Sequence, residues 1–448
     1  MKERMISRLA AMLAVMICAS ACGSTPAGNV TSAAETAVSE TEIKTAAETV
    51  TESAETAAET TGAVSETEEQ ETKPVPVDLS DGITDEMYER GLLSVGDTAR
   101  LCKAFMKGES GQPITIGVIG GSITQGTAAS SPANAYPSVY CKWWEEKFPE
   151  SEITLVNAGI GGTDSYLGVN RVDEQLLAYD PDIVIVEFSV NDTNAATNKY
   201  SYDSLVRKIL LHKSEPAVIL LFMTQENGTS LQNVHREIGE AYDLPMLSWR
   251  DAVYPEVTAG TLDWKDISPD NIHPNDNGHI LTGRFIGRYT EEIYDSLKEN
   301  GALPEPADTS FTAPPLTKDY YSDAKMYYPS TLDTEGEGFD VGSNSVYPGM
   351  FPENWVTDSG GTLRFEADCR TLGFFYLKTT DGKGGRYIVY VDGERRGSID
   401  SDFRGGWGNY GATASVFIED ETKHHTVELV PYDGDENASM TILGIMMS

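Results

Sequence analysis

Basic residues are scarce in this chain of 448 residues. The sequence has 33 Lys and Arg side chains against 70 Asp and Glu, which gives a formal net charge of −37. Nucleic-acid phosphates and anionic membrane surfaces repel a chain of this charge, so neither is an expected partner. The acidity favours solubility and says little about mechanism.

Cysteine is also rare, and the few present fit neither a disulfide framework nor a zinc site. Cys18 and Cys22 lie near the N-terminus, which leaves Cys102, Cys141 and Cys369. Three cysteines cannot all pair, and their spacings match no zinc-binding pattern. We therefore expect mostly buried free thiols. Because no His/Cys/Asp/Glu cluster has metal-ligand spacing, we expect neither a metal nor another cofactor.

The apolar run near the N-terminus is too short for a stable membrane span. It covers residues 9–18, follows three basic residues and is succeeded by Ala-Ser-Ala before Cys22. This pattern is typical of a secretory signal peptide over residues 1–21. It also resembles a bacterial lipobox, which implies lipidation of Cys22 and an extracytoplasmic protein that touches the bacterial membrane only through this anchor. The alternative is an ordinary signal peptide with an incidental Cys22.

Aromatic residues are absent from residues 22–77, which are mainly Thr, Ala, Glu and Ser. With little apolar surface to bury, such a segment does not offset its ordering entropy, so we predict a disordered tether. A helical spacer is the alternative, because Ala and Glu favour helix. The frequent Thr and the lack of an apolar stripe count against it.

Between residues 78 and 303, apolar runs of strand length alternate with helix-like segments. The runs lie at 114–119, 153–157, 183–190, 217–223 and 244–247, and the helix-like segments at 135–147, 165–179, 202–213, 229–242 and about 275–298. This alternation is typical of a parallel sheet that helices cover on both faces. Right-handed crossovers then predict an α/β domain of three layers, of the flavodoxin-like kind.

A Pro-rich linker at 304–317 leads to a segment of different character. Residues 318–448 contain no long amphipathic helix, but Gly/Asp turns separate strand-like runs at 362–366, 373–379, 386–391, 414–418 and 426–430. This predicts a separate all-β sandwich, jelly-roll-like. Because the linker separates two candidate cores, we also predict that a fragment ending near Leu303 folds on its own.

Glycine or polar residues follow three of the predicted parallel strands, where such a fold places its chemistry. Ser122 follows the first strand after two glycines, residues 159–162 follow the second, and Asn191 ends the third. A serine hydroxyl at this edge is a candidate nucleophile, and a glycine amide and an Asn side chain are donors suited to a negative oxygen. Each feature also has a structural interpretation: a loop serine, a Gly-rich turn and a strand-end cap.

His273 has an acidic residue, Asp270, three positions before it in a Pro/Asp/Asn loop. This spacing lets the carboxylate bond one imidazole nitrogen while the other faces a nucleophile. A surface turn that caps the last helix is the alternative. The remaining histidines lack such a partner and are expected at the surface or in packing positions: His212, His235, His279, His424 and His425.

Four segments resemble, in order, the conserved blocks of the SGNH (GDSL-type) esterase/lipase superfamily: GGSIT (120–124), NAGIGG (157–162), SVND (189–192) and DNIHP (270–274). The resemblance covers about residues 113–298. Gly121 and Ser189 depart from the Asp and Gly usual at these positions. Both residues are neighbours of catalytic positions and are not catalytic themselves. The departures therefore leave the subfamily open, and we still expect an active enzyme.

The resemblance implies a role for each matching residue. Ser122 is the nucleophile, His273 the general base and Asp270 its partner. The amides of Ser122 and Gly162 and the side chain of Asn191 form the oxyanion hole. The implied enzyme is a serine esterase that works through an acyl-Ser122 intermediate.

The substrate is expected to be a small acyl ester or an acetylated polysaccharide, because the inter-strand loops hold no insertion large enough for a lipid-binding lid. A tethered esterase with an appended β-sandwich resembles bacterial carbohydrate esterases. Trp249 and Trp264 are candidate sugar contacts, with core packing as the alternative. The segment 403–410, rich in aromatic residues and glycine, is a candidate glycan contact, with a structural cap over the catalytic domain as the alternative.

Two other functions remain open from the sequence. A lipase, acyl-thioesterase or acyltransferase would use the same residues. A catalytically inactive, glycan-binding surface lipoprotein is the alternative of another class, and the complete Ser/Gly/Asn/Asp/His set argues against it. Fold analogy alone does not separate these functions.

Overall fold

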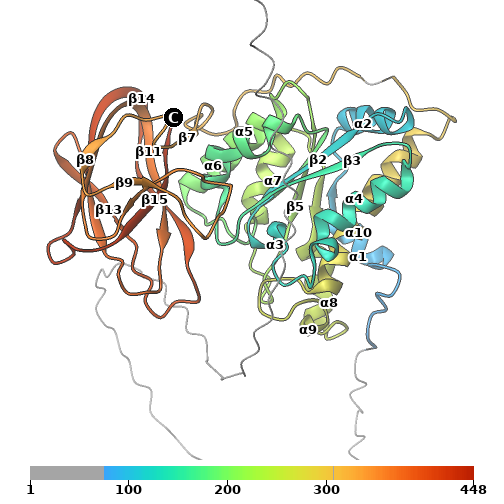
Figure 1. The fold of residues 1–448 in the computed structure, drawn as a ribbon. Coiled ribbons are helices and arrows are strands. Elements are labelled where there is room, and N and C mark those ends of the chain that lie inside the picture. Colours follow the sequence, from blue (N-terminus) through green and yellow to red (C-terminus); the bar gives the residue numbers. More distant parts are fainter. Residues whose placement is uncertain (1–74, 306) are drawn as a thin grey trace, which may run out of the picture. The chain divides into compact units, whose positions relative to one another are not determined.

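The computed structural model describes residues 75–305 and 307–448 (Figure 1). The predicted signal peptide, the predicted lipidation site at Cys22 and almost all of the predicted tether lie outside the described residues. Within the described ranges, no helix has the length and apolar character needed to cross a bilayer.

A six-stranded sheet of order β1-β6-β5-β4-β2-β3 lies at the centre of the first domain. Its strands are β1 (Leu92–Ser94), β2 (Ile114–Gly120), β3 (Ile153–Gly159), β4 (Ile183–Glu187), β5 (Ala217–Phe222) and β6 (Met246–Ser248). Strands β2 to β6 pair in parallel, which confirms the predicted flavodoxin-like α/β sheet. The antiparallel edge strand β1 was not predicted, because three residues are too few to show a pattern.

Helices cover both faces of this sheet, as the ribbon shows (Figure 1). One face carries α5 (Ser165–Gln175), α6 (Ala196–Leu210) and α7 (Gln232–Ala241), and the other carries α2 (Ala99–Glu109), α4 (Tyr136–Lys147) and α10 (Asp276–Leu297). The other α-helices of this domain are α1 (Asp85–Gly91), α3 (Ser122–Gln125), α8 (Trp249–Ala259) and α9 (Trp264–Ile267). In β4, Val184 packs on the first face and Ile185 on the second. Side chains alternate across a strand, so burial on both faces requires the nearly continuous apolar runs in the sequence.

The second domain is antiparallel throughout its ladders. Its main order is β13-β12-β14-β11-β15-β10-β9, with β7 paired to β15 and β8 paired to β11. The strands are β7 (Lys325–Tyr327), β8 (Glu335–Glu337), β9 (Asp340–Gly342), β10 (Asn354–Thr357), β11 (Thr362–Lys378), β12 (Arg386–Val391), β13 (Glu394–Asp400), β14 (Tyr410–Pro431) and β15 (Met440–Met447). This confirms the predicted all-β sandwich.

Two of these strands are longer than the sequence pattern indicated. Strand β11 joins the predicted runs 362–366 and 373–379, and β14 joins 414–418 and 426–430. Their pairing shifts register between Cys369 and Thr371, so the apolar pattern is interrupted although the strand continues.

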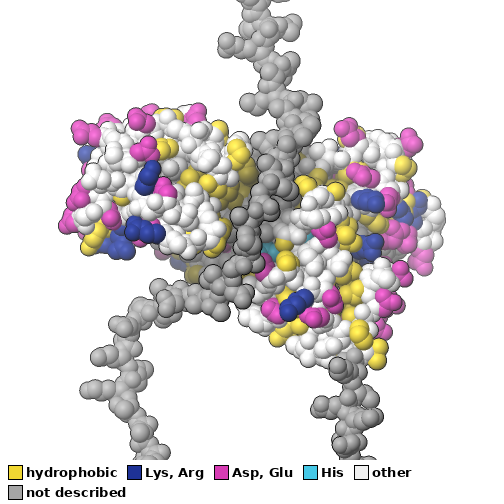
Figure 2. Space-filling view, turned by 60° about the horizontal axis from the view of Figure 1, so that its bottom comes forward, with side chains coloured by type: hydrophobic (Ala, Val, Ile, Leu, Met, Phe, Trp, Pro, Cys, Tyr) yellow, Lys and Arg dark blue, Asp and Glu magenta, His cyan; other side chains and the backbone are white. Residues whose placement is uncertain are grey.

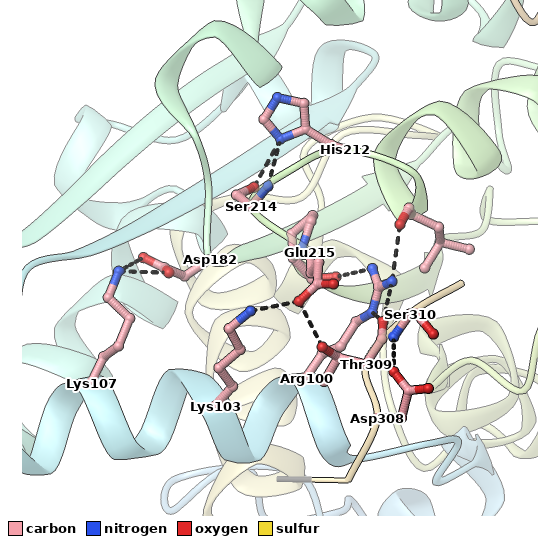
Figure 3. A network of polar contacts seen from close by, with 12 residues as sticks. Arg100, Lys103, Lys107, Asp182, His212, Ser214, Glu215, Asp308, Thr309 and Ser310 are labelled. Atoms are coloured by element: carbon pink, nitrogen blue, oxygen red, sulfur yellow. Dashed lines mark hydrogen bonds and ion pairs between the residues drawn. The ribbon is translucent and has the colours of Figure 1, made fainter. Parts of the chain in front are cut away.

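The Pro-rich linker is bound to the first domain by side chains from its surface (Figure 3). Arg100 donates to the carbonyl of Thr309 at 2.7 Å, and the Thr309 hydroxyl donates to Glu215 at 2.6 Å. Further along, Arg207 donates to the carbonyl of Ala313 at 2.6 Å. The linker is therefore held at several points.

Hydrophobic residues of both domains form one cluster. Tyr166 on α5 meets Tyr321 edge-on, with ring centroids 5.6 Å apart, and the same cluster contains Phe351 and Phe375. Each domain also has a cluster of its own, so the two domains have separate cores and share a third cluster between them. These aromatic residues of the second domain therefore pack in the same cluster as residues of α5.

Acidic side chains are spread over the visible face of the described residues, with Lys and Arg in small groups among them (Figure 2). This distribution fits the excess of negative charge in the sequence.

Candidate active site

Ser122 begins α3 directly after β2, in a turn where two glycines lie close to other residues. A Cβ on Gly120 would lie 2.4 Å from the backbone carbonyl of Glu187, which leaves no room for a side chain. A Cβ on Gly121 would lie 2.2 Å from Oδ1 of Asn191, so any larger residue here requires the Asn191 side chain to move. Gly121, where the family usually has Asp, therefore lies directly against the side chain of Asn191 in this chain.

Ser122, His273 and Asp270 form one chain of hydrogen bonds. The Ser122 hydroxyl lies 2.9 Å from Nε2 of His273, and Nδ1 of His273 lies 2.8 Å from Oδ2 of Asp270. This is the geometry in which an imidazole takes a proton from a serine while a carboxylate fixes its tautomer.

The Asp270 loop is shaped by its own hydrogen bonds. Oδ1 of Asp270 accepts the backbone N–H groups of His273 at 2.7 Å and Ile272 at 2.8 Å. The Ser268 hydroxyl donates to the carbonyls of both Asp270 and His273. Burial alone would raise the pKa of Asp270, but the hydrogen bonds from His273 and Ile272 outweigh it and hold the pKa below its ordinary value. Asp270 therefore stays ionised beside the imidazole.

Gly162 and Asn191 come from the ends of β3 and β4. Gly162 has a φ of 72°, in the left-handed region that glycine adopts without strain. A Cβ on the adjacent Gly161 would lie 3.6 Å from Cβ of Ser122, which places this loop beside the serine. Asn191 contacts Gly121 on the other side, as described above. The structure thus brings together all five residues that the sequence singled out.

Two side chains that the sequence reasoning missed tie the serine turn to the Gly162 loop. The side-chain oxygen of Gln125 accepts the N–H of Gly161 at 2.8 Å, and the Asn157 amide donates to the carbonyl of Thr124 at 2.9 Å. Gln125 lies three residues after Ser122 on the same short helix. This spacing was the only available signal, and it is weak.

The proposed sugar contacts Trp249 and Trp264 are wrong. Their exposed fractions are 1% and 5%, and both belong to the hydrophobic cluster beneath α8 and α10. The Trp264 indole donates to the carbonyl of Asp270 at 2.6 Å, so it supports the loop from inside. Their places next to the strand end and the Asp270 loop were predicted, but their side chains point into the core.

The segment 403–410 of the second domain lies close to the Gly162 loop. A Cβ on Gly162 would be 3.7 Å from the ring of Tyr410. The ring of Trp407 stacks on Tyr410 with centroids 4.9 Å apart, and Trp407 is 74% exposed. An exposed aromatic face therefore stands near the candidate oxyanion hole.

Cys102, Cys141 and Cys369 are buried free thiols. In the part of the chain that the structure describes, no group of three or more His, Cys, Asp or Glu side chains is placed to hold a metal ion.

A buried carboxyl, Glu187, lies behind the serine turn and accepts the Thr124 hydroxyl at 3.2 Å. Burial raises its pKa to about 8 from an ordinary 4.5. The folded state holds this proton more tightly than the unfolded state, so the stabilising contribution is complete below pH 4.5 and is lost as the pH rises through 8.

Glu187→Gln is expected to flatten the pH dependence of stability. At about 1.4 kcal/mol per pKa unit, the wild-type free energy of unfolding should fall by on the order of 4 kcal/mol over this range through Glu187 alone. Thermal unfolding at pH 5 and pH 8.5 measures the difference, with the exposed Glu150→Gln as a matched control. An equal pH slope in Glu187→Gln and wild type would contradict the raised pKa.

Comparison with known proteins gives a consistent assignment. Residues 118–281 match the GDSL-like lipase/acylhydrolase family. A solved two-domain esterase active on acetylated mannans, co-crystallised with mannopentaose, is 30% identical with a TM-score of 0.73, over 81% of this chain and 97% of that one. A second structure of a two-domain esterase active on acetylated mannans is also 30% identical, with a TM-score of 0.72, over 81% of this chain and 98% of that one. Thioesterase 1/protease 1/lysophospholipase L1 of Escherichia coli strain K12 is 25% identical over 187 residues, which are 40% of this chain and 84% of that protein.

The similarity to the two-domain esterase extends over both domains and nearly all of its length. The family match covers β2 to α10, the part of the chain that holds Ser122, Asn191 and His273. The chain therefore belongs to the GDSL-like (SGNH) lipase/acylhydrolase family and is a serine esterase.

Proposed function

We propose that the chain removes small acyl groups, acetyl above all, from carbohydrate through an acyl-Ser122 intermediate. The observation that carries this proposal is the hydrogen-bonded chain from Ser122 through His273 to Asp270. The loops that carry Gly162 and Asn191 lie beside this chain of hydrogen bonds, which supports their proposed role as oxyanion donors.

In the first half of the reaction, the Ser122 hydroxyl attacks the ester carbonyl while Nε2 of His273 takes its proton. The negative carbonyl oxygen accepts hydrogen bonds from the amides of Ser122 and Gly162 and from the Asn191 side chain. His273 then gives its proton to the departing sugar oxygen, which leaves as a hydroxyl. A water molecule, deprotonated by His273, attacks the carbonyl carbon of the acyl-Ser122 ester, and His273 returns the proton to the Ser122 oxygen as the acid is released.

The carbohydrate substrate is supported by two independent observations. The two-domain esterase to which this chain is similar is active on acetylated mannans. In this chain, Trp407 offers an exposed ring next to Tyr410, close to Gly162. An aromatic face is suited to the apolar face of a sugar ring. A polymer chain that lies on Trp407 would bring its acetyl groups to Ser122.

We further propose that the enzyme acts outside the cytoplasm, anchored by a lipid on Cys22. The support is the signal-like N-terminal sequence, with its basic residues, short apolar run and small residues before Cys22. Radiolabelled palmitate incorporated into wild type but not into Cys22→Ala, in a bacterial host, would support the anchor. Release of both proteins into the medium would contradict it.

The substrate class is tested by a screen with the chain from residue 78 onward. The panel contains p-nitrophenyl acetate, butyrate and octanoate, a long-chain acyl-CoA, acetylated mannan and acetylated xylan. We expect acetate to be the best small ester and acetylated polysaccharide to release acetic acid. A preference for octanoate or acyl-CoA would instead favour the lipase or thioesterase alternative.

Trp407→Ala is expected to lower kcat/KM on acetylated polysaccharide by about 5- to 20-fold, because it removes an exposed stacking surface and its contact area. Hydrolysis of p-nitrophenyl acetate should stay within about twofold, because this ester has no sugar ring to stack on Trp407. Tyr432→Ala is the matched control, because Tyr432 is another exposed aromatic of the same domain. Equal losses on both substrates would remove the glycan-binding role of Trp407.

A further inference from the structure

A second Asp–His pair, separate from Asp270 and His273, is buried in the first domain. Nε2 of His235 lies 3.0 Å from Oδ2 of Asp192, and the side chains of His235 and Asp192 are 1% and 0% exposed. No partner for His235 was predicted from the sequence, because Asp192 lies 43 residues away in the chain. Substrate does not reach this pair, and the proposed reaction makes no use of it.

Asp192 connects the two segments that carry the candidate oxyanion donors. It directly follows Asn191, and the backbone N–H groups of both residues donate to the carbonyl of Phe188 at 2.9 and 3.0 Å. The other carboxylate oxygen of Asp192 accepts the backbone N–H of Ser165 at 2.8 Å. Ser165 is the first residue of α5 and lies three residues after Gly162. One carboxylate therefore bridges the Asn191 turn and the Gly162 loop.

His235 is itself held in place. Its ring lies on Tyr202 with centroids 3.6 Å apart and planes 2° from parallel. Tyr202 is on α6 and His235 on α7, so the position of the imidazole is set by two helices of the covering layer. The ring then fixes the carboxylate of Asp192 by a hydrogen bond to Oδ2, while Oδ1 accepts the N–H of Ser165.

Burying a carboxylate is costly, and a buried ion pair is by itself weak evidence for stability. In this chain the pair connects the Asn191 turn to the segment that follows Gly162. An oxyanion hole works only if its donors are held in advance at the place where the negative oxygen develops.

We propose that Asp192, fixed by His235, is a positioning residue that sets the distance between the Asn191 side chain and the Gly162 amide. The inference rests on the proposed roles of Asn191 and Gly162 in the oxyanion hole. It predicts that loss of Asp192 slows the chemical step and leaves substrate binding nearly unchanged.

The test is a double-mutant cycle of Asn191→Ala and Asp192→Ala, read as kcat and KM on p-nitrophenyl acetate. Asn191→Ala should lower kcat by about 10²- to 10³-fold, as for other single oxyanion donors. Asp192→Ala should lower kcat by about 10²-fold with KM within about threefold. Because both changes act on the same donors, the loss in the double variant should be at least about tenfold smaller than the product of the single losses.

Conservative variants separate positioning from stability. Asp192→Asn keeps an oxygen that can accept the Ser165 N–H and should retain more activity than Asp192→Ala. His235→Phe keeps the stack on Tyr202 but removes the donor, and should lower kcat by about tenfold. The matched control is His425→Phe in the second domain, which breaks a similar pair with Asp392, 2.8 Å apart, and should leave kcat unchanged.

Each outcome decides between the two proposals. Normal kcat in Asn191→Ala would overturn the oxyanion role of Asn191 and this inference with it. If Asn191→Ala lowers kcat as expected but the double variant loses the full product of the two single losses, the positioning role alone is overturned. The same follows if the loss in Asp192→Ala lies mainly in KM. If Asp192→Ala does not fold, the cycle with Asp192→Asn and the His235→Phe measurement apply the same criteria.

Discussion

Ser122→Ala is expected to lose about 10⁴-fold or more of kcat on p-nitrophenyl acetate while it folds as the wild type does. The hydroxyl is the only group in the described site placed 2.9 Å from Nε2 of His273, so no other atom can take over the attack. The change removes one oxygen atom, and the turn keeps its backbone hydrogen bonds. Steady-state rates and thermal unfolding of the same preparations measure both parts.

His273→Ala and Asp270→Asn complete this test. His273→Ala should be nearly as slow as Ser122→Ala, and Asp270→Asn less so, because an imidazole in the wrong orientation still offers some base. If Ser122→Ala retained more than a tenth of the activity, the nucleophile would have to be sought elsewhere. A rate abolished by EDTA would point to metal-assisted hydrolysis instead.

The residues of the site could be predicted because a parallel sheet brings the carboxyl ends of its strands to one edge. Ser122, Gly162 and Asn191 follow β2, β3 and β4, and the apolar runs that mark these strands are nearly continuous. The Asp270–His273 contact spans three residues, so it is local enough to be visible in the sequence. Strand position and short-range spacing made these residues candidates, and the resemblance to the four family blocks gave each of them a role.

The supporting contacts could not be predicted, because they join residues that are far apart in the chain. Asp192 and His235 give no sequence signal of their contact. Trp249 and Trp264 stand beside the site in the sequence, but the direction of a side chain depends on packing against α10. A sequence pattern shows where a residue sits along an element, and it does not show which neighbour will cover it.

The same reason explains why the residues shared between the two domains were not predicted. Alternation of apolar residues in a strand shows only that one of its faces is buried. Phe375 on β11 and Met446 on β15 belong instead to the cluster that includes Leu167 and Tyr166 of α5. Which partner buries a given face is a tertiary property.

A fragment that ends at Leu303 is therefore expected to be insoluble or to unfold at a much lower temperature than the chain from 78 to 448. It would expose Tyr166 and lose the contacts of Tyr321 and Phe375. It would also lose the hydrogen bond from Lys208 to the carbonyl of Ala324, 2.6 Å long. Full burial of one large apolar side chain is worth about 1.5–3 kcal/mol, so the loss of several approaches the whole stability of a domain, about 5–15 kcal/mol.

The measurement compares soluble yield, thermal unfolding and p-nitrophenyl acetate hydrolysis for fragments ending at Leu303 and at Ser448. A point-variant control in the longer chain, Tyr321→Ala, should shift the unfolding temperature in the same direction by a smaller amount, because it removes one interface ring and keeps the rest. If the fragment ending at Leu303 were soluble, with the unfolding temperature and the rate of p-nitrophenyl acetate hydrolysis of the longer chain, the first domain would fold independently of the second. The second domain would then matter only for polymeric substrate, whereas an unstable fragment means that it also completes the catalytic domain's hydrophobic core.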